Sequence, residues 1–298
     1  MEKIIEVKHL SKYYGKSRGV IDLSFSVEKG EIFGFIGPNG AGKSTTIRTL
    51  LALIQPTSGT ATIFGKDCIT HAPTIAEKVG YLPGEVYYYD KMRVRELLLY
   101  SASFYGKNCV PNIDRLCKRL DLDQNKRIET LSLGNKKKVG IVQGLIHEPE
   151  LIILDEPTTG LDPLMQQTFF DILKEENEKG ATVLFSSHIL SEVQKICSRV
   201  AIIREGRLVS IEDIAALKQK QVLGVSFEYE GEEAPDLADL PGVSEFTVDH
   251  NLCKLVFQGD VNVLVSTLAN INLVSLHVEE PSLESIFMHY YSAKKDHV

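Results

Sequence analysis

Long apolar runs are missing from this 298-residue sequence. No stretch reaches the ~18 consecutive apolar residues of a membrane-spanning helix. The N-terminus, MEKIIEVKHL, also lacks the charged and then apolar pattern of a signal peptide. We therefore expect that the chain does not enter a membrane by itself and that a membrane role would need a partner chain.

Paired cysteines are missing as well. The sequence has five cysteines, an odd number, and no CxxC pair. Cys109 and Cys117 have no histidine near enough to complete a zinc site. We expect scattered, reduced thiols in a cytosolic protein.

A concentration of positive charge is absent too. Residues 221–298 carry 13 acidic residues against three lysines, whereas the first 220 residues carry 27 acidic and 30 basic residues. Neither part has the basic stripe of a nucleic-acid-binding protein, so we expect no nucleic-acid partner. The shift in charge predicts a domain boundary near residue 220.

Compact apolar runs alternate with helical patterns over residues 1–220. The apolar runs are rich in β-branched residues, which is typical of buried parallel strands. The alternation predicts an α/β fold with a mainly parallel core sheet. We expect strands at 31–37, 150–157 and 181–188, and helices at 43–54, 164–180 and 189–200.

Two regions depart from this alternation. Residues of about 90–145 are mostly helical in pattern and predict a helical subdomain inserted into the α/β domain. Residues 221–298 predict a small α+β accessory domain. In that domain we expect strands at 224–230, 244–250, 251–258 and 273–280, and helices at 261–271 and 281–291.

The segment GPNGAGKST at 37–45 fits the phosphate-loop pattern G-x-x-x-x-G-K-[ST] and joins a predicted strand to a predicted helix. Backbone N–H groups of such a loop and of the helix N-terminus attract phosphate. Lys43 would reach the β- and γ-phosphates, and the Ser44 hydroxyl would hold Mg²⁺. The expected nucleotide contacts are Pro38, Asn39, Gly40, Ala41, Gly42, Lys43, Ser44 and Thr45.

A carboxylate pair ends the predicted strand at 150–157. The carboxyl ends of strands are where open α/β sheets bind ligands. Asp155 would orient Mg²⁺, and Glu156 would act as general base for the attacking water. Without the phosphate loop, the pair would more often be an ordinary turn.

The segment LSLGN at 131–135 offers a second helix N-terminus that favours an anion. One nucleotide does not need two such sites in one chain. Ser132 and Gly134 would therefore face the γ-phosphate held by a second subunit. The alternative is a plain helix cap, with Ser132 or Asn135 capping the helix.

Together these segments resemble the ATP-binding subunit of ABC transporters over about residues 1–215. LSLGN is similar to the signature motif of that family, and TTGLDP at 158–163 resembles its D-loop, with Asp162 at the dimer contact. SSH at 186–188 places His188 as the switch histidine. The resemblance implies that Tyr14 stacks on adenine; Tyr13 is the runner-up, and either tyrosine could instead cover a strand edge.

The end of the chain resembles a narrower branch, the bacitracin-resistance or ABC-2-type drug and peptide exporters. This rests on EPSLESIFMHYY at 280–291 together with the signature segment. The resemblance implies ATP and Mg²⁺, a second ATPase subunit in a homodimer or heterodimer, and an integral membrane permease. It also implies a location at the cytoplasmic face of the membrane. A soluble ABC ATPase without a transport role and an importer ATPase are the alternatives.

The sequence departs from the family at YLPGEVYYYD, 81–90. The strand is normally followed by a glutamine, but Gly84 stands there with Glu85 next to it. Glu85 either reaches the metal or its water shell, or points to solvent while coupling relies on the backbone. The adjacent tyrosines would either dock the permease or pack the subdomain interface. They are Tyr87, Tyr88 and Tyr89.

The signature also differs from the family pattern. Leu133 replaces the usual first glycine and Asn135 the usual glutamine, while Ser132 and Gly134 are kept. The lysines at 136–138 predict a solvated basic face, with contact to ATP or the partner as the alternative.

Overall fold

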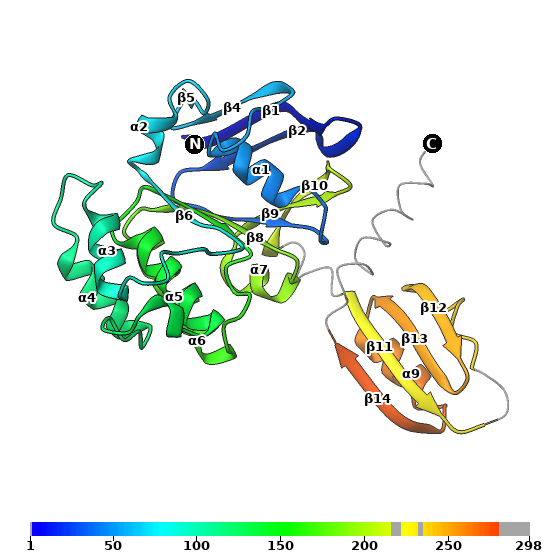
Figure 1. Cartoon of the computed structure of the whole chain (residues 1–298). Coiled ribbons are helices and arrows are strands. Elements are labelled where there is room, and N and C mark those ends of the chain that lie inside the picture. The colour runs from blue at the N-terminus through cyan, green and yellow to red at the C-terminus, as the bar shows by residue number, and fades with distance from the viewer. Residues whose placement is uncertain (1, 216–221, 232–234, 280–298) are drawn as a thin grey trace. The chain divides into compact units, whose positions relative to one another are not determined.

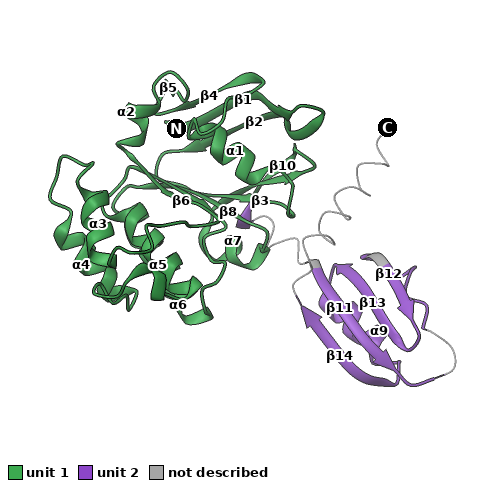
Figure 2. Cartoon of the chain, in the orientation of Figure 1, with its two compact units in different colours: residues 1–212 green, residues 213–298 purple. Residues whose placement is uncertain are grey.

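The computed structural model describes residues 2–215, 222–231 and 235–279. The chain divides into two compact units, Met1–Glu212 and Asp213–Val298 (Figure 2). The domain boundary expected near residue 220 stays a prediction, because residues 216–221 lie outside the described part.

A six-stranded sheet in the order β10-β9-β3-β8-β7-β6 lies at the centre of the first unit (Figure 1). Strands β9, β3, β8, β7 and β6 run parallel. All residues of β3, β7 and β8 are buried, which explains their continuous apolar character. The predicted α/β fold with a mainly parallel sheet is confirmed. The strands are β3 (Ile32–Ile36), β6 (Val79–Leu82), β7 (Leu151–Asp155), β8 (Thr182–Ser187), β9 (Arg199–Arg204) and β10 (Arg207–Asp213).

Helices connect these strands. The pattern predicts one helix as far as residue 200, but α7 ends at Ile196 and β9 begins at Arg199. The reason is the extended backbone of Cys197, with φ −85° and ψ 148°, which stops the helix. The helices are α1 (Lys43–Leu50), α2 (Ala72–Ala76), α6 (Pro163–Glu178) and α7 (Leu190–Ile196).

A second, antiparallel sheet in the order β2-β1-β4-β5 is not among the elements expected from the sequence. Irregular pairing explains this, because the register of β1 against β2 shifts at several points, including between Val7 and Leu10. Ile5, Leu10 and Leu23 of this sheet are fully buried. The strands are β1 (Lys3–Tyr14), β2 (Ser17–Glu28), β4 (Ser58–Ile63) and β5 (Lys66–Asp67).

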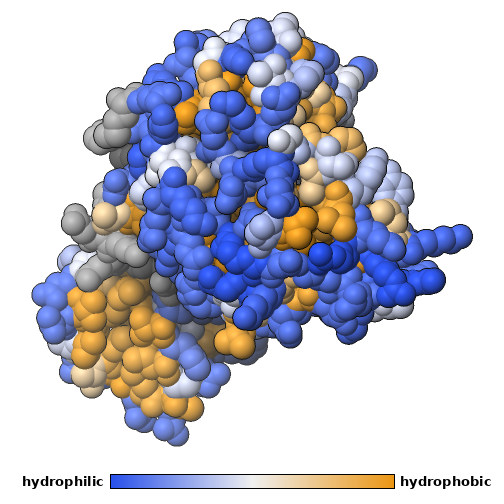
Figure 3. Space-filling model, turned by 90° about the vertical axis from the view of Figure 1, so that its left-hand side faces the viewer, coloured by the Kyte–Doolittle hydropathy of each residue, from blue (hydrophilic) through white to orange (hydrophobic). Residues whose placement is uncertain are grey.

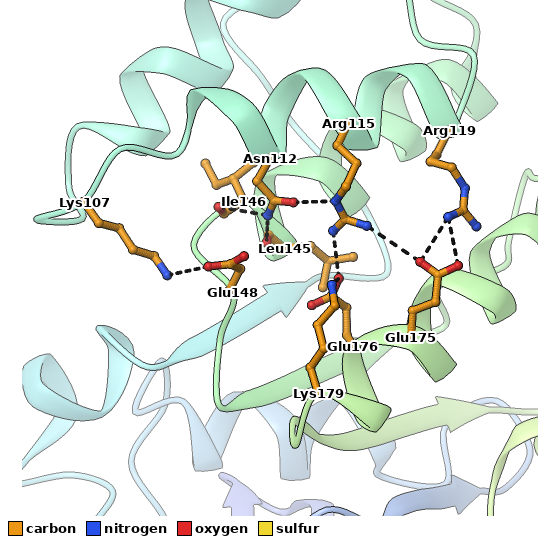
Figure 4. Close-up of polar contacts among 10 residues, drawn as sticks. All are labelled: Lys107, Asn112, Arg115, Arg119, Leu145, Ile146, Glu148, Glu175, Glu176 and Lys179. Atoms are coloured by element: carbon orange, nitrogen blue, oxygen red, sulfur yellow. Dashed lines mark hydrogen bonds and ion pairs between the residues drawn. The ribbon is translucent and has the colours of Figure 1, made fainter.

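Helical elements separate β6 from β7 in the chain, and polar contacts fasten them to core helix α6 (Figure 4). Arg115 donates to the Glu176 carboxylate at 2.8 Å, and the Glu176 side chain is only 4% exposed. Among the inserted elements themselves, Asn112 donates to the carbonyl oxygens of Leu145 and Ile146 at 2.9 and 3.1 Å. These elements are α3 (Val94–Ala102), α4 (Val110–Arg119), the short 3₁₀ helix η1 (Ile128–Thr130) and α5 (Leu133–Leu145).

The second unit holds a four-stranded antiparallel sheet in the order β12-β13-β11-β14. Helix α9 packs on it through Leu264 and Leu268. Apolar side chains gather on the surface of this unit (Figure 3). Val274, Leu276 and Val278 are among its exposed large hydrophobic residues. The helix expected at 281–291 lies outside the described residues. The elements are β11 (Val222–Tyr229), β12 (Val243–Asp249), β13 (Leu252–Gln258), α9 (Val261–Leu268) and β14 (Leu273–Glu279).

Within the described ranges, every helix is too short or too polar to span a bilayer. The five cysteines, all of them in the described part, are buried and carry free thiols.

Candidate functional site

The carboxyl ends of neighbouring parallel strands bring the predicted site residues to one edge of the central sheet. The register pairs Ile36 at the end of β3 with Ser187 of β8, and Ser186 of β8 with Asp155 of β7. Strand β6 continues this edge beside β7. The segments that meet there are the loop at 37–45, the Asp155–Glu156 pair, His188 and the loop at 83–84.

The loop at 37–45 has a backbone that only glycine allows at several points. Gly40 and Gly42 have φ 77° and 107°. A Cβ at Gly37 would lie 2.2 Å from the carbonyl oxygen of Ile203, so no side chain fits there. Helix α1 begins at Lys43, and its N-terminus therefore opens onto the loop, where it favours an anion. The loop and the first turn of α1 hold all the predicted phosphate-loop contacts: Pro38, Asn39, Gly40, Ala41, Gly42, Lys43, Ser44 and Thr45.

Lys43 is the cation of this site and is only 5% exposed. Its Nζ donates to the carbonyl oxygens of Gly37 and Pro38 at 2.6 and 3.2 Å. The same atom lies 3.1 Å from Glu156 Oε1. A buried ammonium with these partners is well placed to exchange the carboxylate for the more highly charged triphosphate.

Glu156 joins Lys43 to His188. Its Oε2 lies 2.8 Å from His188 Nδ1, and its backbone N–H donates to the Ser186 carbonyl oxygen at 3.2 Å. Glu156 has φ 48°, a left-handed conformation that is uncommon outside glycine and is often found at functional sites. The structure thus brings together all three predicted catalytic residues.

Oxygen donors suited to Mg²⁺ lie at the same edge. Asp155 is 3% exposed, and its Oδ1 accepts a hydrogen bond from Ser186 Oγ at 3.0 Å. Ser44 is in the first turn of α1. Carboxylate and hydroxyl oxygens are ligands that Mg²⁺ prefers, so these residues fit the ion.

Gly84 lies beside Asp155, because a Cβ built on it would be 3.8 Å from Asp155 Oδ2. The neighbouring Glu85 is exposed, and its Oε2 accepts a hydrogen bond from the Tyr87 hydroxyl at 2.9 Å. This hydrogen bond raises the pKa of Tyr87. Glu85 thus has a partner on its own loop, which is the contact the structure records for it.

The three adjacent tyrosines differ in exposure. Tyr87 is 85% and Tyr89 is 64% exposed. The Tyr88 hydroxyl is buried without a hydrogen-bond partner among the described residues, and burial raises its pKa. Tyr88 therefore contributes to subdomain packing, and Tyr87 and Tyr89 offer free aromatic surface.

Tyr14 lies close to the phosphate loop. A Cβ at Gly19 would be 3.0 Å from the Tyr14 ring and 3.0 Å from the Thr45 side chain, so these two side chains flank the same point. The backbone N–H of Tyr13 instead donates to Thr57 Oγ1 at 3.0 Å. Tyr14 is 48% exposed, and Lys12 Nζ lies over its ring at 5.3 Å from the centroid.

The signature residues lie in a different place from the phosphate loop. Ser132 caps α5 by accepting the Asn135 N–H at 3.3 Å, and Asp162 caps α6. A Cβ at Gly134 would be 2.7 Å from the Gly160 carbonyl oxygen, so these two loops touch. Ser132, Gly134, Gly160 and Asp162 line one cavity of about 1230 Å³, and no residue of the 37–45 loop is among its lining residues.

One of the three lysines at 136–138 does not lie on the solvated face that the sequence predicts. Lys137 is buried, at 2% exposure, rather than on a solvated face, so that expectation is wrong for this lysine. Helical spacing contains the missing signal: Gly140 and Gly144 lie on the same face of α5, where a neighbour approaches closely.

A family model described as "ABC transporter" matches residues 20–159. The linearmycin resistance ATP-binding protein LnrL of Bacillus subtilis is 33% identical over 306 aligned positions, covering 96% of this chain and 97% of LnrL. The bacitracin transport ATP-binding protein BcrA of Bacillus licheniformis is 38% identical over 234 positions, covering 76% of each chain.

Solved structures agree in fold. The structure described as the ATP binding subunit of an ABC transporter has a TM-score of 0.68 and 32% identity, and covers 72% of this chain and 92% of its own. A dimeric ATP-binding cassette in a post-hydrolysis state with ADP and Pi has a TM-score of 0.65 and 22% identity, and covers 70% of this chain and 98% of its own.

Proposed function

Because the chain belongs to the family of ABC transporter ATP-binding subunits, whose members bind and hydrolyse ATP and act as dimers with membrane permeases, we propose that it drives an exporter. The exported molecule is a drug, a peptide or a lipid, and it crosses through a separate permease. Proteins named for bacitracin transport and linearmycin resistance, both similar to this chain, support export. In the cell, this subunit sits at the cytoplasmic face of the membrane, held there by the permease.

The observation that carries the ATPase assignment is the chain of contacts Lys43–Glu156–His188 beside the phosphate loop. Residues 37–45 bind the triphosphate, and Lys43 moves from Glu156 to the phosphate oxygens. Glu156 then accepts a proton from the attacking water, while His188 Nδ1 holds the carboxylate in place. Ser44 and Asp155 would hold Mg²⁺, which would supply positive charge to neutralise the phosphate oxygens.

The second subunit completes each nucleotide site. Ser132 and Gly134 face the γ-phosphate bound by the partner, and Asp162 lies at the contact between subunits. Their place in a cavity separate from the phosphate loop supports this division of roles. Tyr14 stacks on the adenine ring.

The permease docks near Tyr87 and Tyr89. Their exposed rings border an apolar groove of about 700 Å³ lined also by Leu97, Tyr100 and Phe104. Stiff aromatic surface of this kind is enriched at protein interfaces. Tyr88 supports this surface from below through its packing.

Co-purification tests the proposal. The tagged full chain, expressed in a host that encodes its natural genomic neighbours, is expected to bring down an integral membrane protein. Reconstituted vesicles containing both should then consume ATP faster when a bacitracin-like peptide is present. Uptake into the compartment that contains the ATPase subunit would identify an importer instead, and a chain that hydrolyses ATP but brings down no membrane protein from its natural host would indicate a soluble ABC ATPase.

A further inference from the structure

A buried lysine lies between the signature helix and the metal-binding edge of the site. Lys137 is one of three consecutive lysines on α5, yet it is 2% exposed. Its neighbour Lys136 lies 3.7 Å from Asp90 near the surface. Burying an ammonium group is costly unless hydrogen bonds and opposite charges compensate for the lost water. The partners of Lys137 therefore indicate which part of the site this lysine holds in place.

These partners belong to the loop after β6. Lys137 Nζ donates to the carbonyl oxygens of Pro83 and Gly84 at 3.1 and 2.9 Å. Burial lowers the pKa of Lys137 to about 8, and the carboxylates of Asp155 and Glu156 oppose this lowering. The ammonium therefore has two backbone partners on the loop, and its electrostatic surroundings include the predicted metal ligand Asp155 and the predicted catalytic base Glu156.

Helix α5 packs closely against β6, and Lys137 extends that contact onto the loop that follows β6. A Cβ at Gly80 would be 2.1 Å from the Gly144 carbonyl oxygen. A Cβ at Gly140 would be 2.7 Å from both the Leu82 side chain and the Tyr88 hydroxyl. Lys137 lies three residues before Gly140 on the same face of α5. The packing at Gly140 and Gly144 and the hydrogen bonds of Lys137 therefore form one continuous contact between α5 and the segment of β6 and its following loop.

The loop itself has no side chain with which to approach the carboxylate. A Cβ at Gly84 would be 3.5 Å from the Asp155 carbonyl oxygen, which places the loop backbone directly beside the metal-binding residue. Glu85 faces outward to Tyr87. At Gly84, backbone atoms rather than a side chain therefore approach Asp155.

We propose that Lys137 is a positioning residue for ATP hydrolysis: its ammonium group fastens the carbonyl oxygens of Pro83 and Gly84 to α5 and so fixes the loop against Asp155. It acts through the backbone in a chain whose loop lacks a glutamine. Because α5 begins at the signature, the same contact links the metal-binding edge of one nucleotide site to the Ser132–Gly134 surface that faces the other. The inference rests on the proposed role of Asp155 and Glu156 in hydrolysis.

The test compares Lys137→Met and Lys137→Gln in the full chain. Methionine has a similar length but no donor, whereas glutamine keeps an N–H₂ donor that can still reach a carbonyl oxygen. Lys174→Met, which removes an exposed lysine from α6, is the control. The measurements are kcat and KM for ATP, the Kd for ATP in EDTA, the Mg²⁺ concentration at half-maximal rate, and Tm.

Lys137→Met should lower kcat about tenfold or more, as expected when a catalytic edge is slightly displaced, and should raise the Mg²⁺ requirement while the Kd for ATP in EDTA stays unchanged. Lys137→Gln should recover a clear part of kcat. Wild-type kcat in both variants would overturn the inference. So would equal losses of kcat in both variants that follow their Tm, because these indicate a structural role only.

The experiment distinguishes failure of the proposed role of Lys137 from failure of the proposed ATPase function. A wild-type chain that hydrolyses ATP together with an unaffected Lys137→Met variant rejects only the role of Lys137. A wild-type chain that binds ATP but does not hydrolyse it rejects the proposed function first. If Lys137→Met does not fold, Lys137→Gln is compared with the wild type instead. A folded Lys137→Gln variant with the wild-type kcat and Mg²⁺ requirement would show that the positive charge is dispensable and would overturn the inference. A raised Mg²⁺ requirement at unchanged Tm would support it.

Discussion

The substitution Glu156→Gln should separate ATP binding from ATP hydrolysis. Glutamine keeps the shape of the side chain and an oxygen acceptor toward Lys43, but its amide cannot take a proton from water. Because general base catalysis contributes about 10²–10⁴-fold, kcat should fall by about 10³-fold. His188 would keep a hydrogen-bonding partner at its place, so the geometry of the site should survive.

ATP should bind more tightly to this variant. In the structure, Lys43 Nζ lies 3.1 Å from Glu156 Oε1, a carboxylate that is 19% exposed, and the triphosphate must replace this partner. An ion pair that is partly open to solvent contributes up to about 1 kcal/mol, and the amide of glutamine lacks the charge for this attraction. The variant therefore loses about 1 kcal/mol of competition for Lys43, which corresponds to about fivefold tighter binding. Loss of repulsion between the carboxylate and the γ-phosphate acts in the same direction.

Phosphate release at saturating Mg²⁺-ATP measures kcat, and calorimetric titration with ATP in EDTA measures affinity without turnover. Glu178→Gln, which makes the same chemical change at an exposed position of α6, is the matched control. A near wild-type kcat in Glu156→Gln would refute Glu156 as the base. Weaker ATP binding would refute the competition between carboxylate and triphosphate for Lys43.

Other residues make separate predictions. Tyr14→Ala should weaken ATP binding by about 1–3 kcal/mol, the usual contribution of base stacking, with little change in kcat; an equal loss in Tyr13→Ala would contradict the assignment of the stacking residue. Glu85→Gln should keep the wild-type kcat and Mg²⁺ requirement, because this exposed carboxylate already has a partner on its own loop; a raised Mg²⁺ requirement would assign it to the metal. Arg115→Ala should lower the free energy of unfolding in urea titration by about 2 kcal/mol, because it leaves the buried Glu176 with fewer partners. This figure is below the usual cost of breaking a buried ion pair because the arginine is partly exposed to solvent. An unchanged urea midpoint would show that stability does not need the pair.

The central part of the fold and site could be predicted because local patterns and global topology agree there. An apolar strand followed by a glycine-rich loop and a helix leaves few arrangements for Lys43. Parallel strands end at one edge, so residues more than a hundred positions apart in the sequence, such as Lys43 and Glu156, meet without any local signal of contact. The pattern of buried parallel strands was therefore sufficient to predict that these distant residues share one site.

Elements that depend on irregular or long-range contacts could not be predicted in the same way. The register shifts of β1 break the alternation by which a half-buried strand is identified. Lys137 belongs to a run of lysines that is locally indistinguishable from a solvated face. Its burial depends on the close approach of α5 to β6. Gly80 and Gly144 allow this approach, but neither glycine alone predicts it from the sequence.

The separation of the two anion-favouring sites finally argues that one chain cannot complete a nucleotide site. Ser132 and Gly134 line a cavity without any residue of the loop that contains Lys43. Two inactive variants should therefore complement each other: mixing Lys43→Ala with Ser132→Arg leaves one intact site in each mixed dimer. Ser132 is exposed, so the arginine should block the γ-phosphate without disturbing the core. Random mixing should restore about a quarter of the wild-type rate, because half of the dimers carry one intact site of two. No recovery, in a mixture shown by cross-linking to contain mixed dimers, would mean that each chain completes its own site.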